Sequence, residues 1–425
     1  MPFLKPQFEK DNPFYLTERE GTCMNMKGKT VVIGITGGIA AYKMAQVCSD
    51  LIKKGVDVHV IMTKNATEFI APMVFETLTN NRVSVDTFDR NFQWNVQHVS
   101  LAKKADVFLV APATANIMAK MAWGIADDML STTVLAARCP KLVSPAMNTG
   151  MYDNPATQRN MEMLKKDGVM IIEPDSGFLA CRDVGKGRLP DPAVLETWLE
   201  YAMSPKDLAG KKILISAGPT REPIDPVRFI SNRSTGRMGY EMARAAWLRG
   251  AQVTLVSGPV ELKDPLGVET IRVETAAQMY EAITSRAPEM DIIVKTAAVA
   301  DYTPATVAAD KIKKSGDDMA LEVVRTKDIL KTLGENKPEG QVLCGFSMET
   351  KDLLENSAKK LGGKNADMII ANDLNVEGAG FAVTTNVATI ITKDGAEPLE
   401  LMTKGELSDI ILSRALDLYN QKHNG

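Results

Sequence analysis

The sequence predicts an α/β protein built from two doubly wound, Rossmann-like three-layer domains with mainly parallel sheets. Short β-branched apolar runs alternate with helical segments, as is typical of parallel strands covered by helices on both faces. The alternation stops at 204–210, "SPKDLAG", and then starts again with a strand and a glycine–proline turn. A chain of 425 residues suits two domains, because single cores rarely grow past roughly 250–300 residues.

Three segments are therefore expected: an N-terminal extension at 1–26, a first domain at 27–203 and a second domain at 204–425. The extension carries charges throughout and has no apolar core, so it does not resemble a signal peptide. No apolar run approaches the roughly 20 residues that a membrane-spanning helix needs. The sequence thus predicts no membrane segment.

The first domain should contain a parallel sheet and its covering helices. Strands are expected at 30–36, 56–63, 83–88, 106–114, 141–148 and 169–174. Helices are expected at 39–54, 66–79 and 115–137, with another between the last two strands. Residues 178–190, "FLACRDVGKGRLP", lack strand alternation and contain glycines that would break a helix, which predicts a flexible exposed loop.

The second domain repeats the scheme. Strands are expected at 211–220, 251–258, 290–302, 341–350, 367–374 and 387–392. Helices are expected at 234–250 and at 404–420, the latter amphipathic. Ligands of such sheets bind beyond the carboxyl ends of the strands, so polar motifs at those ends carry most weight.

Composition excludes several classes of function. A net charge of -3 and a pI of about 5.9 give no indication of nucleic-acid binding. The 3 histidines argue against a multi-histidine metal site, and no set of metal ligands is predicted. The 5 cysteines are scattered without a CxxC pair, which favours a reducing compartment and predicts a cytoplasmic protein.

The stretch "GITGGIAAYK", 34–43, reads as a strand, a glycine turn and a helix start. The Thr36 hydroxyl and the free amides of the turn would form a phosphate site. The stretch is not GxGxxG, and the second strand ends in Met62–Thr63 instead of an acid, so a dinucleotide fingerprint is absent. A mononucleotide phosphate such as that of FMN fits better, although a turn needed only for packing is an equal alternative.

Other polar residues of the first domain stand at strand ends. Thr114 and Asn116 follow one strand, and Asn148 follows another, where it could clamp a carboxylate or amide or serve only as a turn residue. Asp127–Asp128 interrupt an apolar helix and are more easily explained as a solvated turn. Among the histidines, His98 is the best candidate for a general base, because it stands at a loop-to-helix entry.

The second domain has a long polar segment, 216–239, that ends at a helix start and predicts an anion site. Its relevant residues are Arg228, Arg233, Ser234, Thr235, Gly236 and Arg237. Lys360 and Lys364 are one helical turn apart and could face one ligand. No GxxxxGK[ST] loop is present, so P-loop kinase chemistry is excluded.

Several motifs together resemble one family. "GITGGIAAYK", His98, "APATAN", "PAMNTGMYDN" and "ACRDVGKGRL" occur in the order found in the flavin half of the bifunctional bacterial coenzyme A biosynthesis proteins. That family combines phosphopantothenoylcysteine decarboxylase with phosphopantothenate–cysteine ligase. Its PxMNxxM and ACxxxGxGR motifs are both met, although Arg182 stands where the family often has glycine.

For the first domain the resemblance implies FMN as cofactor and decarboxylation as the reaction. His98 would be the base, Asn148 and Met147 would hold the substrate carboxylate, and Cys181 would donate a proton from a flap that includes Ala180 and Arg188. The implied cofactor-binding residues are Thr36, Gly37, Gly38, Ile39, Ala40, Thr63, Pro112, Ala113, Thr114 and Asn116.

For the second domain the resemblance implies ligation of cysteine to 4'-phosphopantothenate with CTP and Mg2+. Asn232 and Arg228 would hold the acyl-nucleotide, and Lys311 would lie closest to the charge transfer. The implied nucleotide-binding residues are Lys295, Thr296, Ala297, Asp301, Lys327, Asp328, Ile329, Leu330, Phe346, Lys360 and Lys364.

The resemblance also implies trimeric flavin domains, dimeric ligase domains and small-molecule substrates as the only partners, without nucleic acid or membrane. Three alternatives remain from the residues themselves. They are a pyridine-nucleotide dehydrogenase, a non-catalytic flavoprotein regulatory subunit, and a monofunctional enzyme whose other half has decayed.

Overall fold

The computed structural model describes residues 26–88, 96–178, 182–313, 320–349, 353–373 and 383–424. These residues form two compact units, with the division between Asp207 and Leu208. Met26, which the sequence places in the N-terminal extension, is only 5% exposed and belongs to the core of the first unit. The first unit therefore includes this residue.

The first unit contains a 5-stranded sheet in the order β2-β1-β3-β4-β5, with all pairs parallel. Its strands are β1 Thr30–Ile35, β2 Asp57–Met62, β3 Val107–Ala113, β4 Lys141–Pro145 and β5 Met170–Ile171. Adjacent residues of β1 point to opposite faces: Val31 packs into one hydrophobic cluster and Val32 into the other. The sheet is therefore buried on both sides.

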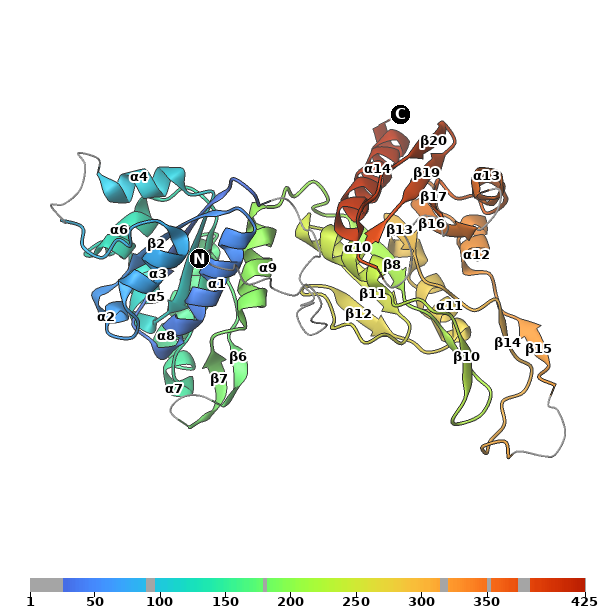
Figure 1. Ribbon diagram of the computed structural model, residues 1–425, viewed down its shortest axis with the longest axis horizontal. Coiled ribbons are helices and arrows are strands. Elements are labelled where there is room, and N and C mark those ends of the chain that lie inside the picture. Colours follow the sequence, from blue (N-terminus) through green and yellow to red (C-terminus); the bar gives the residue numbers. More distant parts are fainter. Residues whose placement is uncertain are drawn as a thin grey trace, which may run out of the picture. The chain divides into compact units, whose positions relative to one another are not determined.

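Helices cover both faces of this sheet (Figure 1). One cluster is completed by α1 Lys43–Lys53, α3 Pro72–Thr79 and α9 Pro192–Met203. The other is completed by α4 Gln97–Lys104, α5 Ala115–Trp123, α6 Met129–Ala136 and α8 Pro155–Lys166. The short elements are the 3-10 helix Ile39–Tyr42, α2 Lys64–Thr67 and α7 Thr149–Tyr152.

The structure corrects several sequence-based boundaries. The helix expected over 115–137 is two helices, because Gly124 takes a left-handed conformation after α5 and Asp128 caps α6. The helix expected over 66–79 is likewise divided into α2 and α3, and the one over 39–54 begins as a 3-10 turn. The strand expected over 83–88 is only an isolated bridge between Ser84 and Ile61.

The expected loop over 178–190 is wrong in part. Two strands, β6 Asp175–Phe178 and β7 Val184–Arg188, pair in antiparallel fashion. Exposed residues dominate both strands, so the alternation that marks a half-buried strand is missing from this stretch.

The second unit contains an 8-stranded sheet in the order β12-β11-β8-β13-β16-β17-β19-β20. Pairs from β12 to β17 are parallel, and the last two pairs are antiparallel. The strands are β8 Lys212–Ala217, β11 Gln252–Ser257, β12 Glu269–Arg272, β13 Ile292–Lys295, β16 Val342–Glu349, β17 Met368–Asp373, β19 Ala388–Thr392 and β20 Gly395–Pro398. The remaining strands form short pairs: β9 Arg221–Pro223 with β10 Phe229–Ser231, β14 Tyr302–Pro304 with β15 Val323–Arg325, and β18 Thr385–Asn386 with β21 Met402–Thr403.

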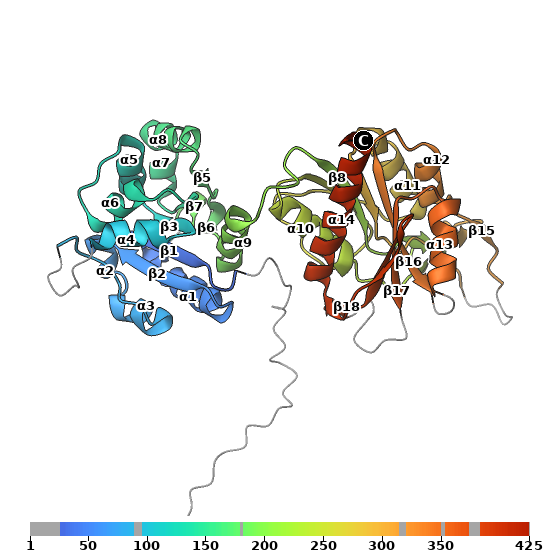
Figure 2. The same ribbon diagram turned by 90° about the horizontal axis from the view of Figure 1, so that it is seen from above.

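Helices again lie on both faces of this sheet (Figure 2). On one face, α10 Arg237–Leu248 packs against α14 Lys404–Asn424. On the other, the core joins α11 Ala276–Thr284, α12 Ile329–Glu335 and α13 Leu353–Gly363, with the 3-10 helix Ala287–Glu289 beside them. Both units thus confirm the predicted doubly wound α/β class. Among the described residues, no helix is both long and apolar enough to cross a bilayer.

Candidate active sites

The candidate site of the first unit lies at the carboxyl edge of its sheet. Thr36, Thr63, Thr114 and Asn148 directly or closely follow β1, β2, β3 and β4. A strand order of 2-1-3-4-5 reverses direction between β1 and β3, which is where doubly wound sheets bind ligands and where flavodoxin-like sheets hold FMN. The predicted cofactor residues surround this point.

Thr36 joins the two strands that flank the reversal. Its hydroxyl donates to the carbonyl oxygen of Pro112 at 2.6 Å and accepts from the amide of Thr114 at 3.1 Å. Only 2% of Thr36 is exposed. Its hydroxyl therefore holds the two loops together, and its role in cofactor binding remains a prediction.

The turn after Thr36 offers amides without acceptors. Within the described residues, the main-chain N–H groups of Gly38, Ile39 and Ala40 form no hydrogen bond. A β-carbon at Gly38 would meet nothing within 4 Å, whereas one at Gly37 would come within 2.6 Å of the Asn65 β-carbon. Gly37 is needed for packing, while Gly38 borders open space beside free donors. This arrangement fits a phosphate group such as that of FMN.

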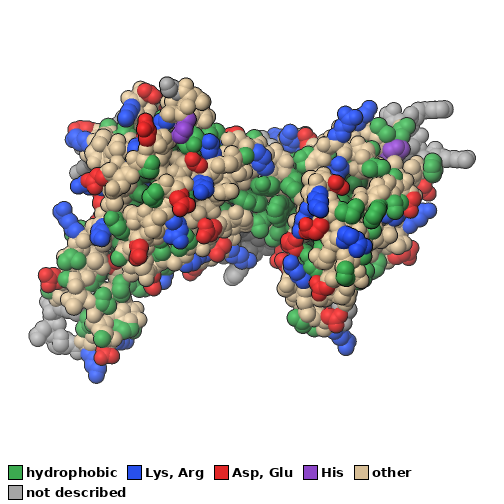
Figure 3. Space-filling model, turned by 180° about the vertical axis from the view of Figure 1, so that it is seen from behind, with side chains coloured by type: hydrophobic (Ala, Val, Ile, Leu, Met, Phe, Trp, Pro, Cys, Tyr) green, Lys and Arg blue, Asp and Glu red, His purple; other side chains and the backbone are tan. Residues whose placement is uncertain are grey.

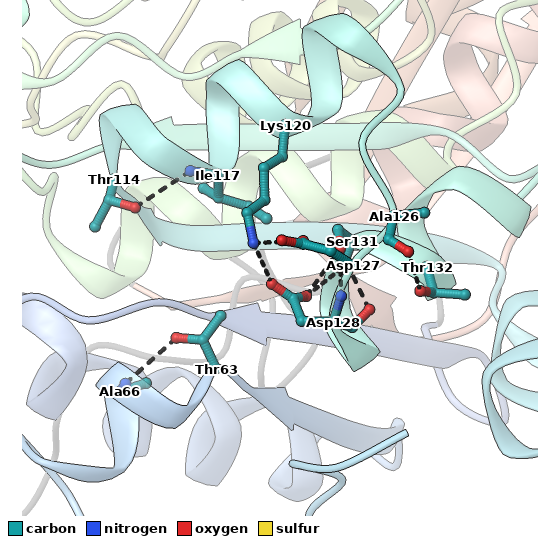
Figure 4. A network of polar contacts seen from close by, with 10 residues as sticks. All are labelled: Thr63, Ala66, Thr114, Ile117, Lys120, Ala126, Asp127, Asp128, Ser131 and Thr132. Carbon is teal, nitrogen blue, oxygen red and sulfur yellow. Dashed lines mark hydrogen bonds and ion pairs between the residues drawn. The ribbon is translucent and has the colours of Figure 1, made fainter. Parts of the chain in front are cut away.

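Thr63 and Thr114 cap the helices that follow their strands (Figure 4). The Thr63 hydroxyl accepts from Ala66 at 3.3 Å, and the Thr114 hydroxyl accepts from Ile117 at 3.4 Å. Asn116 is exposed in the first turn of α5. Pro112 and Ala113 are buried residues of β3, so only their main chain could approach a ligand.

The two adjacent acids of this unit start a helix. Asp128 caps α6 in a capping box with Ser131, and Lys120 bonds Asp127 at 2.6 Å and Asp128 at 2.7 Å (Figure 4). Burial acts to raise the pKa of Asp128, but the bonds from Lys120 and Ser131 outweigh it and lower the pKa. The pair is therefore a helix cap and not an interruption within one helix.

Asn148 connects the fourth strand to the β6–β7 hairpin. Its Oδ1 accepts from the amide of Gly150 at 2.8 Å, and its Nδ2 donates to Asp183 at 2.8 Å. The amide of Met147 donates to the carbonyl of Gly187 at 3.0 Å. The structure thus brings the predicted carboxylate-binding residues next to the base of the predicted flap.

The flap motif is only partly described. Ala180 and Cys181 lie outside the described residues. Arg188, in β7, has a side chain that is 48% exposed and stands 3.9 Å from Asp191. Arg182 adopts a φ of 70°, the left-handed region that favours glycine.

His98 is half-buried at the start of α4. Among the described residues no hydrogen bond or ion pair of His98 is found. Its role as a base therefore remains a prediction. His59, in contrast, contacts Asp57 at 3.3 Å and Lys104 at 2.9 Å within the fold.

In the second unit, a cavity of 370 Å3 lies where the strand order reverses between β8 and β13. We call it the switch-point cavity. Its wall includes seven of the predicted residues: Asn232, Lys295, Thr296, Ala297, Asp301, Phe346 and Lys360. The turn at 234–239 before and within α10 completes this wall.

A second cavity, of 570 Å3, shares Lys295, Asp301, Phe346 and Lys360 with the first. We call it the lysine cavity. It adds the other predicted nucleotide residues, Lys327, Asp328, Ile329, Leu330 and Lys364. Lys360 and Lys364 both line it, as their helical spacing predicts.

Hydrogen bonds fix several of these side chains. Asn232 Nδ2 donates to the carbonyl of Ala298 at 2.9 Å, and Lys364 pairs with Asp328 at 2.6 Å. Burial, followed by the positive charge of Lys360, lowers the pKa of Lys295 to about 8. Concentrated positive charge of this kind suits a polyanion.

Arg228 and Lys311 do not line either cavity. Arg228 pairs with Asp225 at 2.6 Å, and its Nη2 donates to the carbonyl of Ile312 at 3.0 Å. The Arg228 guanidinium holds the pKa of Asp225 below its ordinary range. Arg228 therefore belongs to a separate polar anchor with Asp225 and Ile312, whereas Lys311 is exposed and its role in the ligase remains a prediction.

The sequence reasoning missed one end of the switch-point cavity. Lys404, at the start of α14, is 4% exposed and lines it together with Asn372 and Asn386. Burial, followed by the charge of Arg237, lowers the pKa of Lys404 to about 8. Asn372 follows the strand-end rule applied elsewhere, but no local pattern in the sequence connects Lys404 to this wall.

Two family models match the chain. The model described as "Flavoprotein" matches residues 20–199, and the model described as "DNA/pantothenate metabolism flavoprotein C-terminal domain" matches residues 208–418. A solved structure, that of the C-terminal domain of a coenzyme A biosynthesis bifunctional protein CoaBC, is 45% identical. It covers 51% of this chain and 99% of that chain, with a TM-score of 0.44.

Full-length relatives match as well. The coenzyme A biosynthesis bifunctional protein CoaBC of Bacillus subtilis is 48% identical over 401 residues, which cover 93% of this chain and 98% of that protein. The protein of the same name from Escherichia coli K12 is 41% identical over 404 residues, covering 94% and 100%. The chain therefore belongs to the family of coenzyme A biosynthesis bifunctional proteins.

Proposed function

We propose that this chain catalyses two consecutive steps of coenzyme A biosynthesis. Its second unit ligates cysteine to 4'-phosphopantothenate, and its first unit decarboxylates the product to 4'-phosphopantetheine. The observation that carries the proposal is the 48% identity to a bifunctional relative across 93% of this chain, which spans both units. We assign the decarboxylase to 27–203 and the ligase to 204–425.

In the decarboxylase, the donor group of Asn148 would hold the substrate carboxylate. FMN bound at the Gly38–Ala40 amides would supply the oxidation of the substrate CH2–SH group and the later reversal of that oxidation. Without the oxidation, the electrons left by decarboxylation would have no sink. His98 would accept a proton during oxidative decarboxylation. Cys181 would return a proton when the enethiol is reduced, because a thiol with a pKa near ~8.5 is mostly protonated at neutral pH.

In the ligase, the nucleotide would be CTP and would occupy the switch-point and lysine cavities. The substrate carboxylate attacks the α-phosphorus of CTP, and the bond to pyrophosphate breaks. The cysteine amine then attacks the resulting anhydride and releases CMP. Lys295, Lys360 and Lys364 would stabilise the charge that develops on the departing pyrophosphate, with Mg2+ as the expected metal.

An oligomer is part of the proposal. The first unit exposes large apolar side chains on several helices, including Met73, Trp123 and Leu135 at 71%, 64% and 60% exposure. Hydrophobic side chains at the molecular surface are coloured green in Figure 3. Exposed apolar groups of this size support contacts with further copies of the chain, for which we propose trimeric flavin units and dimeric ligase units. The cytoplasmic location stays a prediction.

Two measurements test the proposal. The purified protein should show flavin absorbance that changes on denaturation, and it should convert phosphopantothenate, cysteine and CTP to phosphopantetheine, CO2, CMP and pyrophosphate. ATP in place of CTP tests the choice of nucleotide. A protein without flavin, or without either product, would contradict the corresponding half.

Two substitutions separate catalysis from a regulatory role. Cys181→Ser should still release CO2 but accumulate the oxidised enethiol, and Lys311→Gln should slow acyl-cytidylate formation. Normal turnover by Cys181→Ser and by a His98→Asn variant would favour the non-catalytic regulatory role. A pyridine-nucleotide dehydrogenase is disfavoured by the missing GxGxxG fingerprint.

A further inference from the structure

Strand β7 of the predicted flap lies against the segment that is expected to hold the substrate carboxylate. A β-carbon at Gly187, where φ is +137°, would lie 2.2 Å from the carbonyl oxygen of Met147. A β-carbon at Gly185 would lie 2.7 Å from the Thr149 hydroxyl. Because both glycines lack a side chain, the two stretches of chain can approach this closely. One face of β7 is therefore used for contact with the substrate-holding segment.

A single carboxylate oxygen joins β7 to the helix that follows this segment. Oε2 of Glu173 accepts a hydrogen bond from the Tyr152 hydroxyl at 2.8 Å and another from Lys186 Nζ at 3.0 Å. Tyr152 ends α7, Lys186 is the middle residue of β7, and Glu173 follows β5. The Lys186 ammonium also lies 5.6 Å from the centre of the Tyr152 ring. We call these three side chains the hairpin clamp.

The Tyr152–Glu173 bond is the buried half of the clamp. Tyr152 is only 4% exposed and belongs to the hydrophobic cluster beneath α5, α6 and α8. Burial, followed by the bond to Glu173, raises the pKa of Tyr152, so its hydroxyl stays protonated and donates. A buried hydroxyl that loses its acceptor is costly. The core therefore fixes the position of the Glu173 carboxylate.

Lys186 forms the solvent-accessible half. Its side chain is 46% exposed, and that of Glu173 is 50% exposed. Burial acts to raise the pKa of Glu173, but the bonds from Lys186 and Tyr152 outweigh it and lower the pKa, so the carboxylate is charged at neutral pH. An exposed ion pair usually contributes little, because two long side chains must be ordered. Here Tyr152 already orients the acid, so less order remains to be imposed.

The clamp acts on the same contact as Asn148. Asn148 Nδ2 donates to Asp183, which directly precedes β7. The amide of Tyr152 donates to the carbonyl of Asn148 at 2.9 Å, so α7 connects the clamp to this residue. A displacement of β7 from Tyr152 therefore also moves the hairpin away from Asn148. The Asn148 side chain itself is held by Gly150 and would stay in place.

We propose that Glu173 and Lys186 are positioning residues of the decarboxylase, which hold β7 beside Asn148 by way of Tyr152. The inference rests on the proposed function. Neither residue is among the site residues that the resemblance implies, and neither would touch the reacting atoms. Their effect should fall on the reduction of the enethiol, which the proposed function assigns to the flap, and not on the release of CO2.

The experiment supplies phosphopantothenoylcysteine to an excess of the full-length holoprotein with oxygen removed. Loss of flavin absorbance reports the oxidative step together with CO2 release, and its return reports the consumption of the enethiol. The variants are Glu173→Gln and Lys186→Met. Amide hydrogen exchange across 184–188 gives a measurement that does not depend on activity, and thermal unfolding verifies that each variant is folded.

Two further variants serve as controls. Lys165→Met is matched to Lys186→Met, because Lys165 is 44% exposed and lies 3.8 Å from the other oxygen of Glu173, but belongs to α8 instead of the hairpin. Lys186→Arg keeps a charged donor on β7. Both controls should stay within about twofold of the wild type in every measurement.

We expect consumption of the enethiol to slow about fivefold or more in Glu173→Gln and Lys186→Met, as when a hydrogen bond to a charged group is lost. Exchange across 184–188 should become faster, while CO2 release stays within about twofold of the wild type. The double variant should be about as slow as the slower single variant, because both substitutions remove the same bond.

Three results would overturn the inference. The first is an unchanged rate of enethiol consumption in both single variants. The second is an equal loss of CO2 release and enethiol consumption, because a merely structural role would slow both steps alike. The third is a double variant whose loss is the product of the two single losses, since the two residues would then act independently.

The inference and the proposed function fail differently. If the wild type with FMN neither bleaches nor releases CO2, the proposed decarboxylase is wrong and the positioning role falls with it. If the wild type completes both steps and the clamp variants do so at the same rates, only the positioning role is wrong.

Discussion

Asn148 donates a hydrogen bond from Nδ2 to the carboxylate of Asp183 at 2.8 Å, so the residue expected to hold a substrate carboxylate already holds one of the chain's own. Asp183 stands at the base of β7, two positions after Cys181. The Asn148 amide is oriented by its second bond, from Gly150 to Oδ1, which leaves Nδ2 as the donor. A substrate carboxylate that uses this donor must displace Asp183 or share it.

Replacing Asp183 with alanine should therefore strengthen substrate binding. Loss of one competing hydrogen bond of about 0.5–1.5 kcal/mol corresponds to a KM for phosphopantothenoylcysteine about two- to tenfold lower. Asp175→Ala is the matched control, because Asp175 is an exposed carboxylate of the same hairpin without a bond to Asn148. A higher KM in Asp183→Ala would show instead that Asp183 aligns Asn148 for the substrate.

Replacing Arg182 with glycine should stabilise the backbone at this position. A φ of 70° costs a residue with a β-carbon about 1–2 kcal/mol, and glycine avoids that cost. Arg182→Gly and Arg182→Ala remove the same charge, but only glycine relieves the backbone. Amide hydrogen exchange across 184–188 should accordingly be slower in the glycine variant than in the alanine variant. Equal exchange in the two would mean that the left-handed conformation stores no strain.

The fold was predictable because its signals are local and repeated. Buried strands such as 30–35 and 213–217 are continuous apolar runs, and each precedes a glycine turn and a helical pattern. The errors arise where one residue decides the outcome. Asp128 begins a new helix in a stretch that periodicity alone would continue, and the β6–β7 hairpin has no buried face to produce alternation.

The candidate sites likewise include residues that the sequence could place and residues that it could not. Strand-end reasoning singled out Asp301, because the carboxyl ends of parallel strands share an edge, and the family resemblance added Lys295 and Phe346, which line the same cavity. It could not place Lys404, which reaches that cavity from the C-terminal helix. Nor could it show that the Thr36 hydroxyl is used between two loops, since that bond joins residues 76 positions apart.

Valine substitutions at the adjacent Gly37 and Gly38 should have different effects on stability and on FMN binding. Gly38→Val should leave the unfolding temperature of the apoprotein unchanged, because Gly38 has an extended φ of -159° and open space around it. Its dissociation constant for FMN should rise about tenfold or more if a phosphate occupies that space. Gly37→Val should lower the apoprotein's unfolding temperature by about 2–4 °C or more, because it meets Asn65. If Gly38→Val binds FMN with normal affinity, the phosphate of FMN does not bind at this turn.

The Asp128 cap should stabilise α6 at neutral pH. Asp128→Ala removes the capping bond, worth about 1 kcal/mol, and should speed hydrogen exchange across Met129–Ala136 about fivefold. Asp127→Ala, which changes an exposed partner of the same lysine, should have a smaller effect. Since the folded pKa of Asp128 is lowered, its contribution is present above the unfolded value of 3.8 and is lost as the pH falls through the folded pKa. If the difference in hydrogen exchange between wild type and Asp128→Ala persists at pH values below the folded pKa, the charged Asp128 cap is not what stabilises α6.

Nucleotide binding should weaken as the pH rises through 8. The pKa of Lys295 is lowered to about 8, chiefly by burial and then by Lys360, while Asp328 and Asp301 act in the opposite direction. At pH 7 the ammonium group is therefore mostly present, and above pH 8 it is mostly lost. A bound polyphosphate favours the protonated form and raises this pKa, so the affinity for CTP should fall by up to about tenfold per pH unit between the two pKa values.

Lys295→Arg separates this titration from other effects of pH, because arginine keeps its charge throughout the range. The dissociation constant of CTP, measured by calorimetry from pH 7 to 9.5, should vary less steeply in this variant. We attribute the remaining dependence of the CTP dissociation constant on pH to Lys404. Its pKa is also about 8, and it lines the switch-point cavity. Lys359→Arg is the control, because Lys359 is 69% exposed on the same helix as Lys360 and lines neither the switch-point nor the lysine cavity. If Lys295→Arg and wild type show the same slope, the charge that binds the polyphosphate is not that of Lys295.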